Sequence, residues 1–209
     1  MDTYVYVDGF NLYYGAVKDT PYKWLDPARL CKNLLKPQDK IRKVKYFTAR
    51  VSARPSGPGQ PQRQDVFLRA LRTIPALEII YGHFITKNVS MLQAGLPAGT
   101  KRFVNVVKTE EKGSDVNLAT HLVNDAHNGV FELAVLITND SDLLEAVRIV
   151  KRELKLCVGL LNPHQHPSRV LKAEADFIKQ IRASVLARSQ FPPTLTDAHG
   201  QFTKPPSWP

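Results

Sequence analysis

Cysteine is scarce in this chain of 209 residues, which contains only Cys31 and Cys157. The two lie far apart and match no metal-binding spacing, so we expect buried thiols in a reducing compartment and no disulfide framework. The chain also lacks a run of about 20 apolar residues that could span a membrane, and its first residues lack the basic head and apolar core of a signal peptide. These absences predict a cytoplasmic protein with no membrane partner.

Acidic residues are also few, with 19 Asp and Glu against 29 Lys and Arg, for a formal charge of +10. Such a chain attracts polyanions, either phosphate backbones or anionic membranes. Its length suffices for one substantial core and does not require two. We expect one domain over residues 1–185, followed by a proline-rich, mobile tail over residues 186–209.

Strand and helix patterns alternate along the chain. Short runs rich in Val, Ile, Tyr and Phe predict strands at 3–8, 43–49, 77–85, 103–108, 132–138 and 156–161. Helical spacing and caps predict helices at 26–35, 63–73, 114–128, 142–152 and 175–188. Segments 53–62 and 86–102 read as a loop and a surface excursion. This alternation is typical of a three-layer α/β sandwich with a mostly parallel sheet.

Four aspartates stand where such a fold would gather them. Asp8 ends the first predicted strand, Asp115 lies at the start of a helix, and Asp140 and Asp142 follow the strand at 132–138. The carboxyl ends of parallel strands share one edge of the sheet, where ligands bind. Carboxylates gathered in one pocket repel one another unless a cation neutralises them, and hard oxygen ligands suit Mg²⁺ or Mn²⁺. The pattern therefore indicates a metal-dependent phosphodiesterase.

Each of these acids also has a purely structural interpretation. Asp8 precedes Gly9 and is suited to a turn or a helix cap, and Asp115 is favoured by the dipole of its helix. Capping accounts for one of Asp140 and Asp142, but not for both. Both interpretations stay open on spacing alone.

Taken together, segments 6–12, 109–119 and 136–143 resemble the NYN domain, in the DUF88/LabA-like branch of the PIN-like nuclease superfamily. The resemblance extends over roughly residues 3 to 182, in the family's order and spacing. It implies a PIN-like fold in which Asp8, Asp115 and Asp140 coordinate Mg²⁺ or Mn²⁺ and Asp142 completes the catalytic set. Asn11 matches the family's polar residue beside the first Asp.

The activity that the resemblance implies is metal-dependent hydrolysis of RNA, and we expect an endoribonuclease. Lys112 lies next to a proposed ligand and could contact the scissile phosphate or merely pair with Glu110 or Glu111. Three arginines bracket the loop after the second strand and are candidates for backbone contacts: Arg50, Arg54 and Arg63.

Two other functions remain as alternatives. Similar sequences are often named as a flavin- and NADH-dependent hydroxysuccinoylpyridine monooxygenase, although this chain has no Gly-x-Gly-x-x-Gly motif after a strand. The third hypothesis is a non-catalytic RNA-binding regulator that keeps the acids as caps. The sequence leaves homo-oligomer formation open.

Overall fold

A six-stranded parallel sheet forms the centre of the computed structural model, which describes residues 1–53, 57–97 and 99–208. The strand order is β3-β2-β1-β6-β7-β8. The strands are β1 (Asp2–Asp8), β2 (Lys40–Thr48), β3 (Leu77–Tyr81), β6 (Leu133–Ile137), β7 (Cys157–Asn162) and β8 (Phe177–Gln180). The predicted parallel α/β fold is confirmed.

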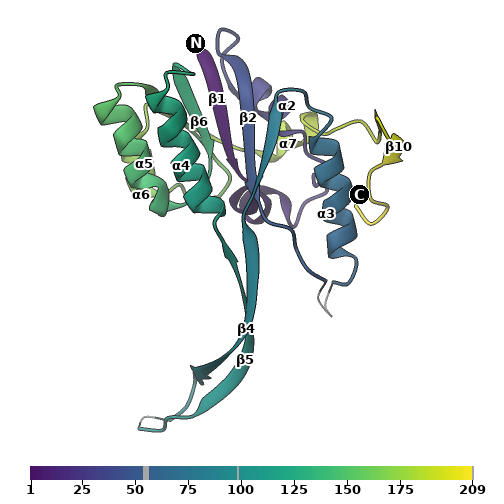
Figure 1. Cartoon of the computed structure of the whole chain (residues 1–209), viewed down its shortest axis with the longest axis vertical. Helices are drawn as coiled ribbons and strands as arrows, with labels where there is room; N and C mark the ends of the chain where they lie inside the picture. The colour runs from purple at the N-terminus through teal and green to yellow at the C-terminus, as the bar shows by residue number, and fades with distance from the viewer. Residues whose placement is uncertain (54–56, 98, 209) are drawn as a thin grey trace.

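Helices cover both faces of this sheet (Figure 1). One face carries α2 (Pro27–Leu34), α3 (Gln60–Leu71) and α7 (Ala183–Arg188), and the other carries α4 (Ser114–His127), α5 (Leu144–Arg148) and α6 (Arg169–Glu174). The short α1 (Gly9–Leu12) follows β1 and continues as a π-turn over Tyr13–Val17. The helix predicted at 142–152 is composite, because a 3-10 turn (Ser141–Leu143) precedes α5 and a π-turn (Ile149–Glu153) follows it.

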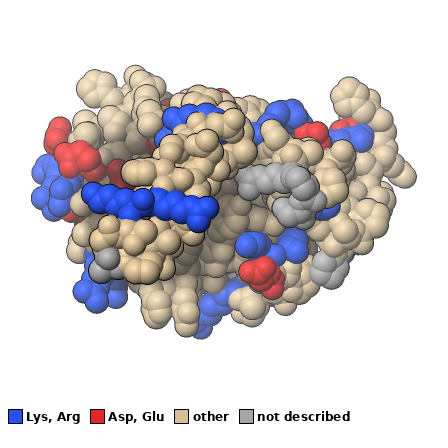
Figure 2. Space-filling view, turned by 90° about the horizontal axis from the view of Figure 1, so that it is seen from below, with Lys and Arg blue, Asp and Glu red and all other residues tan. Residues whose placement is uncertain are grey.

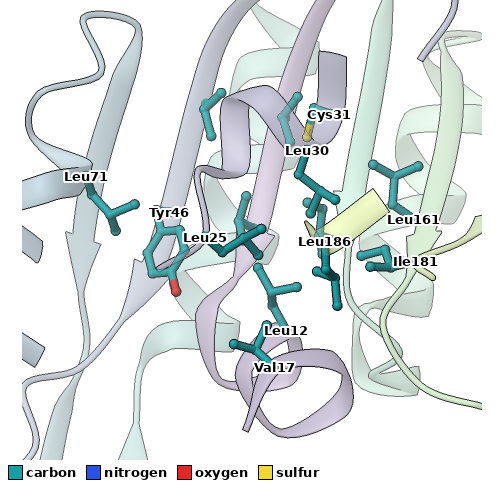
Figure 3. Close-up of a cluster of buried hydrophobic side chains, with 14 of the residues drawn as sticks. Leu12, Val17, Leu25, Leu30, Cys31, Tyr46, Leu71, Leu161, Ile181 and Leu186 are labelled. Carbon is teal, nitrogen blue, oxygen red and sulfur yellow. The ribbon is translucent and has the colours of Figure 1, made fainter. Parts of the chain in front are cut away.

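Strand alternation divides the core into two clusters. Val5 and Val7 of β1 face the side of α2 and α7, whereas Tyr6 between them faces α4. Figure 3 shows the first cluster, in which Leu30 of α2 and Leu186 of α7 meet side chains from the strands. Because β1 is buried on both faces, its position is fixed from both sides, and so is the residue that ends it.

A long antiparallel hairpin leaves the body between β3 and α4 (Figure 1). It pairs β4 (His83–Leu92) with β5 (Phe103–Lys112). The prediction of one strand at 77–85 is wrong, because the chain divides at Gly82 and only the first part joins the main sheet. A Cβ at Gly82 would lie 2.6 Å from the carbonyl oxygen of Lys112, so the close approach of this residue to the end of β5 requires glycine. Most of the predicted excursion at 86–102 is therefore strand and turn of this arm.

The single helix predicted at 175–188 is wrong. In its place the chain forms β8 and then α7, after the separate helix α6. The ring of Phe177 packs directly over Gly159 of β7, where any Cβ would collide with it. This close approach seats β8 at the edge of the sheet, and it depends on a residue in another strand.

The C-terminal segment packs on the body. Its strands β9 (Thr194–Asp197) and β10 (Gly200–Thr203) form a hairpin. The Arg69 guanidinium donates two 2.7 Å hydrogen bonds to Asp197, and the ring of Trp208 lies 6.2 Å from that of Trp24. A frayed terminus would not make these contacts with the body. The domain boundary at 185 and the mobility of the tail stay predictions.

Three smaller expectations can be compared with the structure. Cys31 is buried as predicted, but Cys157 is exposed at the start of β7, so the prediction of two buried thiols is half wrong. None of the described helices is both long enough and apolar enough to cross a bilayer. Part of the predicted loop at 53–62 lies outside the described residues, and α3 begins within its last part.

Candidate active site

The order of the strands creates a crevice at one edge of the sheet. β1 lies between β2 and β6, and the chain runs outward from it in both directions. In parallel sheets this switch point leaves an opening beyond the carboxyl ends of the strands, where ligands bind. Val7 pairs in register with Ile137, so Asp8 ends β1 beside the turn that carries Asp140.

A pocket of about 270 Å³ opens at this edge, and we call it the acidic pocket. Among the described residues, four carboxylates and no Lys or Arg line it: Asp8, Glu111, Asp115 and Asp140. Asn11, Ser114, Phe10, Tyr14, Val51, Gln60 and Phe84 complete the wall. The structure thus brings together three predicted acids that are separated by 107 and 25 residues in sequence (115 − 8 and 140 − 115).

Asp8 is the most buried of these acids, with 4% of its surface exposed. One carboxylate oxygen accepts a 2.9 Å hydrogen bond from the backbone N–H of Asn11, and the other accepts one of 3.1 Å from the Thr138 hydroxyl. Burial, which is the largest cause, acts together with the charges of Asp115 and Asp140 to raise the pKa of Asp8 to about 6, against the opposing effect of the two hydrogen bonds. Asp8 is a helix cap and also part of a charged cluster.

Asn11 joins the two strand ends. Its side-chain oxygen accepts a 2.9 Å hydrogen bond from the backbone N–H of Asn139, in the turn after β6. In the same turn the Thr138 hydroxyl, which donates to Asp8, accepts a 3.1 Å bond from the N–H of Asp140. The two turns are therefore locked to each other, which fixes the separation of Asp8 and Asp140.

Asp115 reaches the pocket from the first turn of α4. Burial raises its pKa, followed in order by the charges of Asp140, Glu111 and Asp142. Gly113, with φ of 95°, allows the sharp turn from the arm into this helix. At both Asp8 and Asp115, burial first and the neighbouring carboxylates second oppose ionisation and raise the pKa.

Sequence reasoning missed Glu111 as a member of the pocket and considered it only as a partner for Lys112. Its carboxylate accepts hydrogen bonds from the Ser114 backbone N–H at 3.1 Å and from the Ser114 hydroxyl at 2.8 Å. An acid three residues before a helix start is a recognisable capping signal. This signal could have placed Glu111 beside Asp115.

A buried ion pair holds α4 against the sheet. The Lys45 ammonium of β2 lies 2.6 Å from a carboxylate oxygen of Asp125, which also accepts a 2.8 Å hydrogen bond from the Tyr6 hydroxyl. Because β1, β2 and α4 meet in this one network, the helix that carries Asp115 is fixed relative to the strand that ends in Asp8.

Two predicted residues near the site do not line the acidic pocket. Asp142 is exposed, and its backbone N–H donates a 3.0 Å hydrogen bond to the carboxylate of Asp140, which caps this turn. The Lys112 ammonium lies 3.8 Å from Glu110, which is the pairing alternative left open by the sequence. A phosphate contact by Lys112 and a catalytic role for Asp142 stay predictions.

The three predicted arginines have different positions. Arg50 is exposed and forms a 2.6 Å ion pair with Asp65. Arg54 lies outside the described residues. Arg63 lines a second cavity that adjoins the acidic pocket. Figure 2, viewed along the arm, shows Lys and Arg side chains at several places on this face and fewer Asp and Glu.

The acidic pocket suits a divalent cation by its donor atoms. Within residues 1–53, 57–97 and 99–208, no three His, Cys, Asp or Glu side chains are grouped closely enough to hold a metal ion. The pocket nevertheless offers hard carboxylate oxygens whose ionisation is opposed by burial and by one another. A divalent cation would relieve both costs, so the residues fit Mg²⁺ or Mn²⁺.

These features define a parallel α/β domain with a carboxylate pocket at its switch point. The family model of the NYN domain matches residues 2–186, and the chain belongs to this family. The NYN family is part of the PIN-like nuclease superfamily, and its members are typically nucleases that bind RNA and use divalent metals.

Two individual proteins are also similar to this chain. A 6-hydroxy-3-succinoylpyridine 3-monooxygenase, HspA, of Pseudomonas putida (strain DSM 28022 / S16) is 29% identical over 99% of this chain and 75% of its own length. The crystal structure of a protein of unknown function, VPA0982, from Vibrio parahaemolyticus RIMD 2210633 superimposes with a TM-score of 0.56. That match covers 87% of this chain and 93% of the other at 18% identity, so it supports the fold alone.

Proposed function

We propose that this protein is a metal-dependent ribonuclease that hydrolyses RNA phosphodiester bonds at the acidic pocket. The observation that carries the proposal is the meeting of Asp8, Asp115 and Asp140 in one pocket whose wall, over the part of the chain that the structure describes, contains no Lys or Arg. A pocket built only to stabilise the fold would pair these charges, because uncompensated buried carboxylates are costly.

Asp8, Asp115 and Asp140 would hold Mg²⁺ or Mn²⁺, which when bound supplies a nucleophilic water and neutralises charge on the scissile phosphate. Thr138 and the Asn11 backbone orient the two oxygens of Asp8 through the hydrogen bonds described above. Glu111 adds negative charge beside Asp115 and fixes the start of α4 through Ser114. Such supporting contacts hold ligands in place and tune their basicity.

The net charge of +10 supports a polyanionic substrate. Arg50 and Lys112 lie outside the pocket and are already paired with carboxylates. Their contribution to substrate binding is thus proposed only as long-range attraction, which salt would screen.

The decisive experiment is cleavage of an end-labelled single-stranded RNA by the purified protein. Cleavage is expected with Mn²⁺ or Mg²⁺, is expected to stop with excess EDTA, and should return when Mn²⁺ is added back. Cleavage that persists in EDTA, or its absence with every divalent ion on several RNAs, would overturn the proposal. RNA binding without cleavage would instead favour a regulator whose aspartates serve as caps.

The similarity to HspA favours a second candidate, a flavin- and NADH-dependent monooxygenase acting on 6-hydroxy-3-succinoylpyridine, because it extends over 99% of this chain. This candidate predicts a protein that is yellow as purified because it holds a flavin. It also predicts NADH oxidation on addition of the pyridine. A colourless protein that leaves NADH unchanged after incubation with free flavin would exclude it.

A further inference from the structure

A second cavity of about 380 Å³ adjoins the acidic pocket at the same edge of the sheet, and we call it the aromatic cavity. Its volume is in the range of small-molecule sites. Six aromatic side chains line it: Phe10, Tyr13, Tyr14, Tyr46, Phe67 and Trp208. Lys23, Gln60, Arg63 and Gln64 are the longer polar side chains of the wall.

Two cations of this cavity have no acidic partner in the part of the chain that the structure describes. Lys23 and Arg63 are both half-buried, and over the described part of the chain no carboxylate lies within ion-pair distance of either. Arg69, on the same helix as Arg63, is by contrast bound by Asp197. Half-buried cations that are not neutralised by the protein favour an anionic ligand.

The aromatic cavity is continuous with the acidic pocket. Phe10, Tyr14, Val51 and Gln60 line both hollows. The negative charge of Asp8 also contributes to the raised pKa of Tyr46, after the larger effect of burial, which places the two residues within electrostatic reach. A ligand that extends along the edge of the sheet can therefore occupy both hollows at once.

The ligand chemistry follows from these walls. Planar aromatic walls favour a flat ring through stacking, and Lys23 and Arg63 favour an anion beside that ring. Tyr14 is 60% exposed, so one of the stacking surfaces is accessible from solvent. Two kinds of ligand combine an aromatic ring with an anionic group in this way: a nucleotide and a small pyridine acid.

We propose that the aromatic cavity is a base-binding subsite, which holds the nucleobase and flanking phosphate of the RNA nucleotide next to the scissile bond. The inference rests on the proposed function for the identity of the ligand as RNA. It assigns Arg63 to the flanking phosphate and Tyr14 and Trp208 to contacts with the base. Trp208 comes from the C-terminal segment, so this segment becomes part of the substrate site.

Equilibrium binding in EDTA tests this subsite without any cleavage. A fluorescein-labelled single-stranded RNA of eight nucleotides is titrated with wild-type protein, Arg63→Gln and Arg72→Gln, and anisotropy is measured. Arg72 is the matched control because it caps the C-terminal end of the helix that carries Arg63, donates a hydrogen bond to the Tyr81 hydroxyl and lines neither hollow. Arg63→Gln is expected to weaken binding about tenfold, and Arg72→Gln less than twofold.

A second arm separates base recognition from simple charge attraction. The same titration uses an oligomer with an abasic ribose at every position. Wild-type protein should bind it about tenfold more weakly than the natural RNA, since base–aromatic stacking is lost. Trp208→Leu should remove most of this difference while leaving binding of the abasic oligomer unchanged, and it provides a second variant should Arg63→Gln not fold.

Three results would overturn the subsite. The first is equal weakening of RNA binding by Arg63→Gln and Arg72→Gln. The second is equal binding of the natural and abasic oligomers by wild-type protein. The third is binding of nicotinate in the cavity, together with RNA binding that Arg63→Gln leaves unchanged. The last would assign the cavity to a small aromatic acid. Binding that depends on Arg63 and on the bases, in a protein that cleaves no RNA, would support the subsite and refute only the nuclease.

Discussion

The two hollows at the carboxyl edge of the sheet share four wall residues yet carry opposite charge. Within residues 1–53, 57–97 and 99–208, the acidic pocket contains four carboxylates and no Lys or Arg, whereas the aromatic cavity contains Lys23 and Arg63 and no Asp or Glu. In the core, by contrast, the buried Lys45 and Asp125 are paired with each other. Opposite charges that lie side by side without pairing support the proposal that one ligand occupies both hollows.

The largest effect is expected from removing charge at the centre of the acidic pocket. Asp8→Asn should reduce metal-dependent RNA cleavage by roughly 100-fold or more, because losing even indirect ligand contacts costs about 10- to 100-fold. Asp2→Asn is the matched control, since Asp2 begins the strand that Asp8 ends and is half-exposed. Initial rates on labelled RNA at saturating Mn²⁺ measure both. A cleavage rate of Asp8→Asn equal to that of the wild type would show that the acidic pocket is not the site of catalysis.

The two aspartates after β6 should differ from each other. Asp140 lines the acidic pocket and Asp142 does not, although each lies in the same turn. Asp140→Asn should therefore lower the cleavage rate by roughly 10- to 100-fold, and Asp142→Asn only a few-fold. The Mn²⁺ concentration for half-maximal rate should rise more for Asp140→Asn. Equal losses from the two changes would show that exposure at the turn does not distinguish their roles.

Salt titration tests whether the cations of the aromatic cavity contact phosphate. RNA affinity should fall linearly on a log–log plot against salt, with a slope of about −0.7 for each phosphate contacted by a cation. Lys23→Gln and Arg63→Gln should each reduce that slope by about 0.7, whereas Arg72→Gln should leave it unchanged. The slopes are measured by anisotropy titrations of each variant at four salt concentrations. An unchanged slope in both cavity variants would mean that these cations contact no phosphate.

The smallest effect concerns stability without metal. The pKa of Asp8 is raised to about 6 from 3.8, so the folded state holds this proton more tightly than the unfolded chain does. This group therefore lowers stability as pH rises from about 4 to 6, by up to about 3 kcal/mol at neutral pH. Asp8→Asn removes the cost and keeps a good cap, so it should stabilise the metal-free protein at pH 7.5 and by much less at pH 4.

Thermal midpoints in EDTA at the two pH values provide the measurement. For a chain of this length each 1 kcal/mol corresponds to roughly 2–4 °C. A midpoint of Asp8→Asn below that of wild type at pH 7.5 would show that capping outweighs charge repulsion at this position.

Local sequence determined the catalytic candidates and most of the elements that carry them. The apolar runs before Asp8 and Asp140 predict strands because alternate side chains must be buried on two faces, and the acids then follow at strand ends. The helical spacing after Ser114 likewise placed Asp115 in a first turn. These features depend on neighbours within a few residues, which is why the pattern alone was sufficient.

Long-range packing decided the rest. The strand β8 depends on Phe177 resting over Gly159, and the arm leaves the sheet because Gly82 passes close to Lys112. Hydrophobic burial and charge compensation act between residues that meet only after folding, so no local pattern reveals them. Sequence therefore supplied Asp8, Asp115 and Asp140. Only the tertiary structure added Glu111 to the pocket, set Lys112 against Glu110, left Arg63 without an acidic partner among the described residues, and placed Trp208 in the wall of the aromatic cavity.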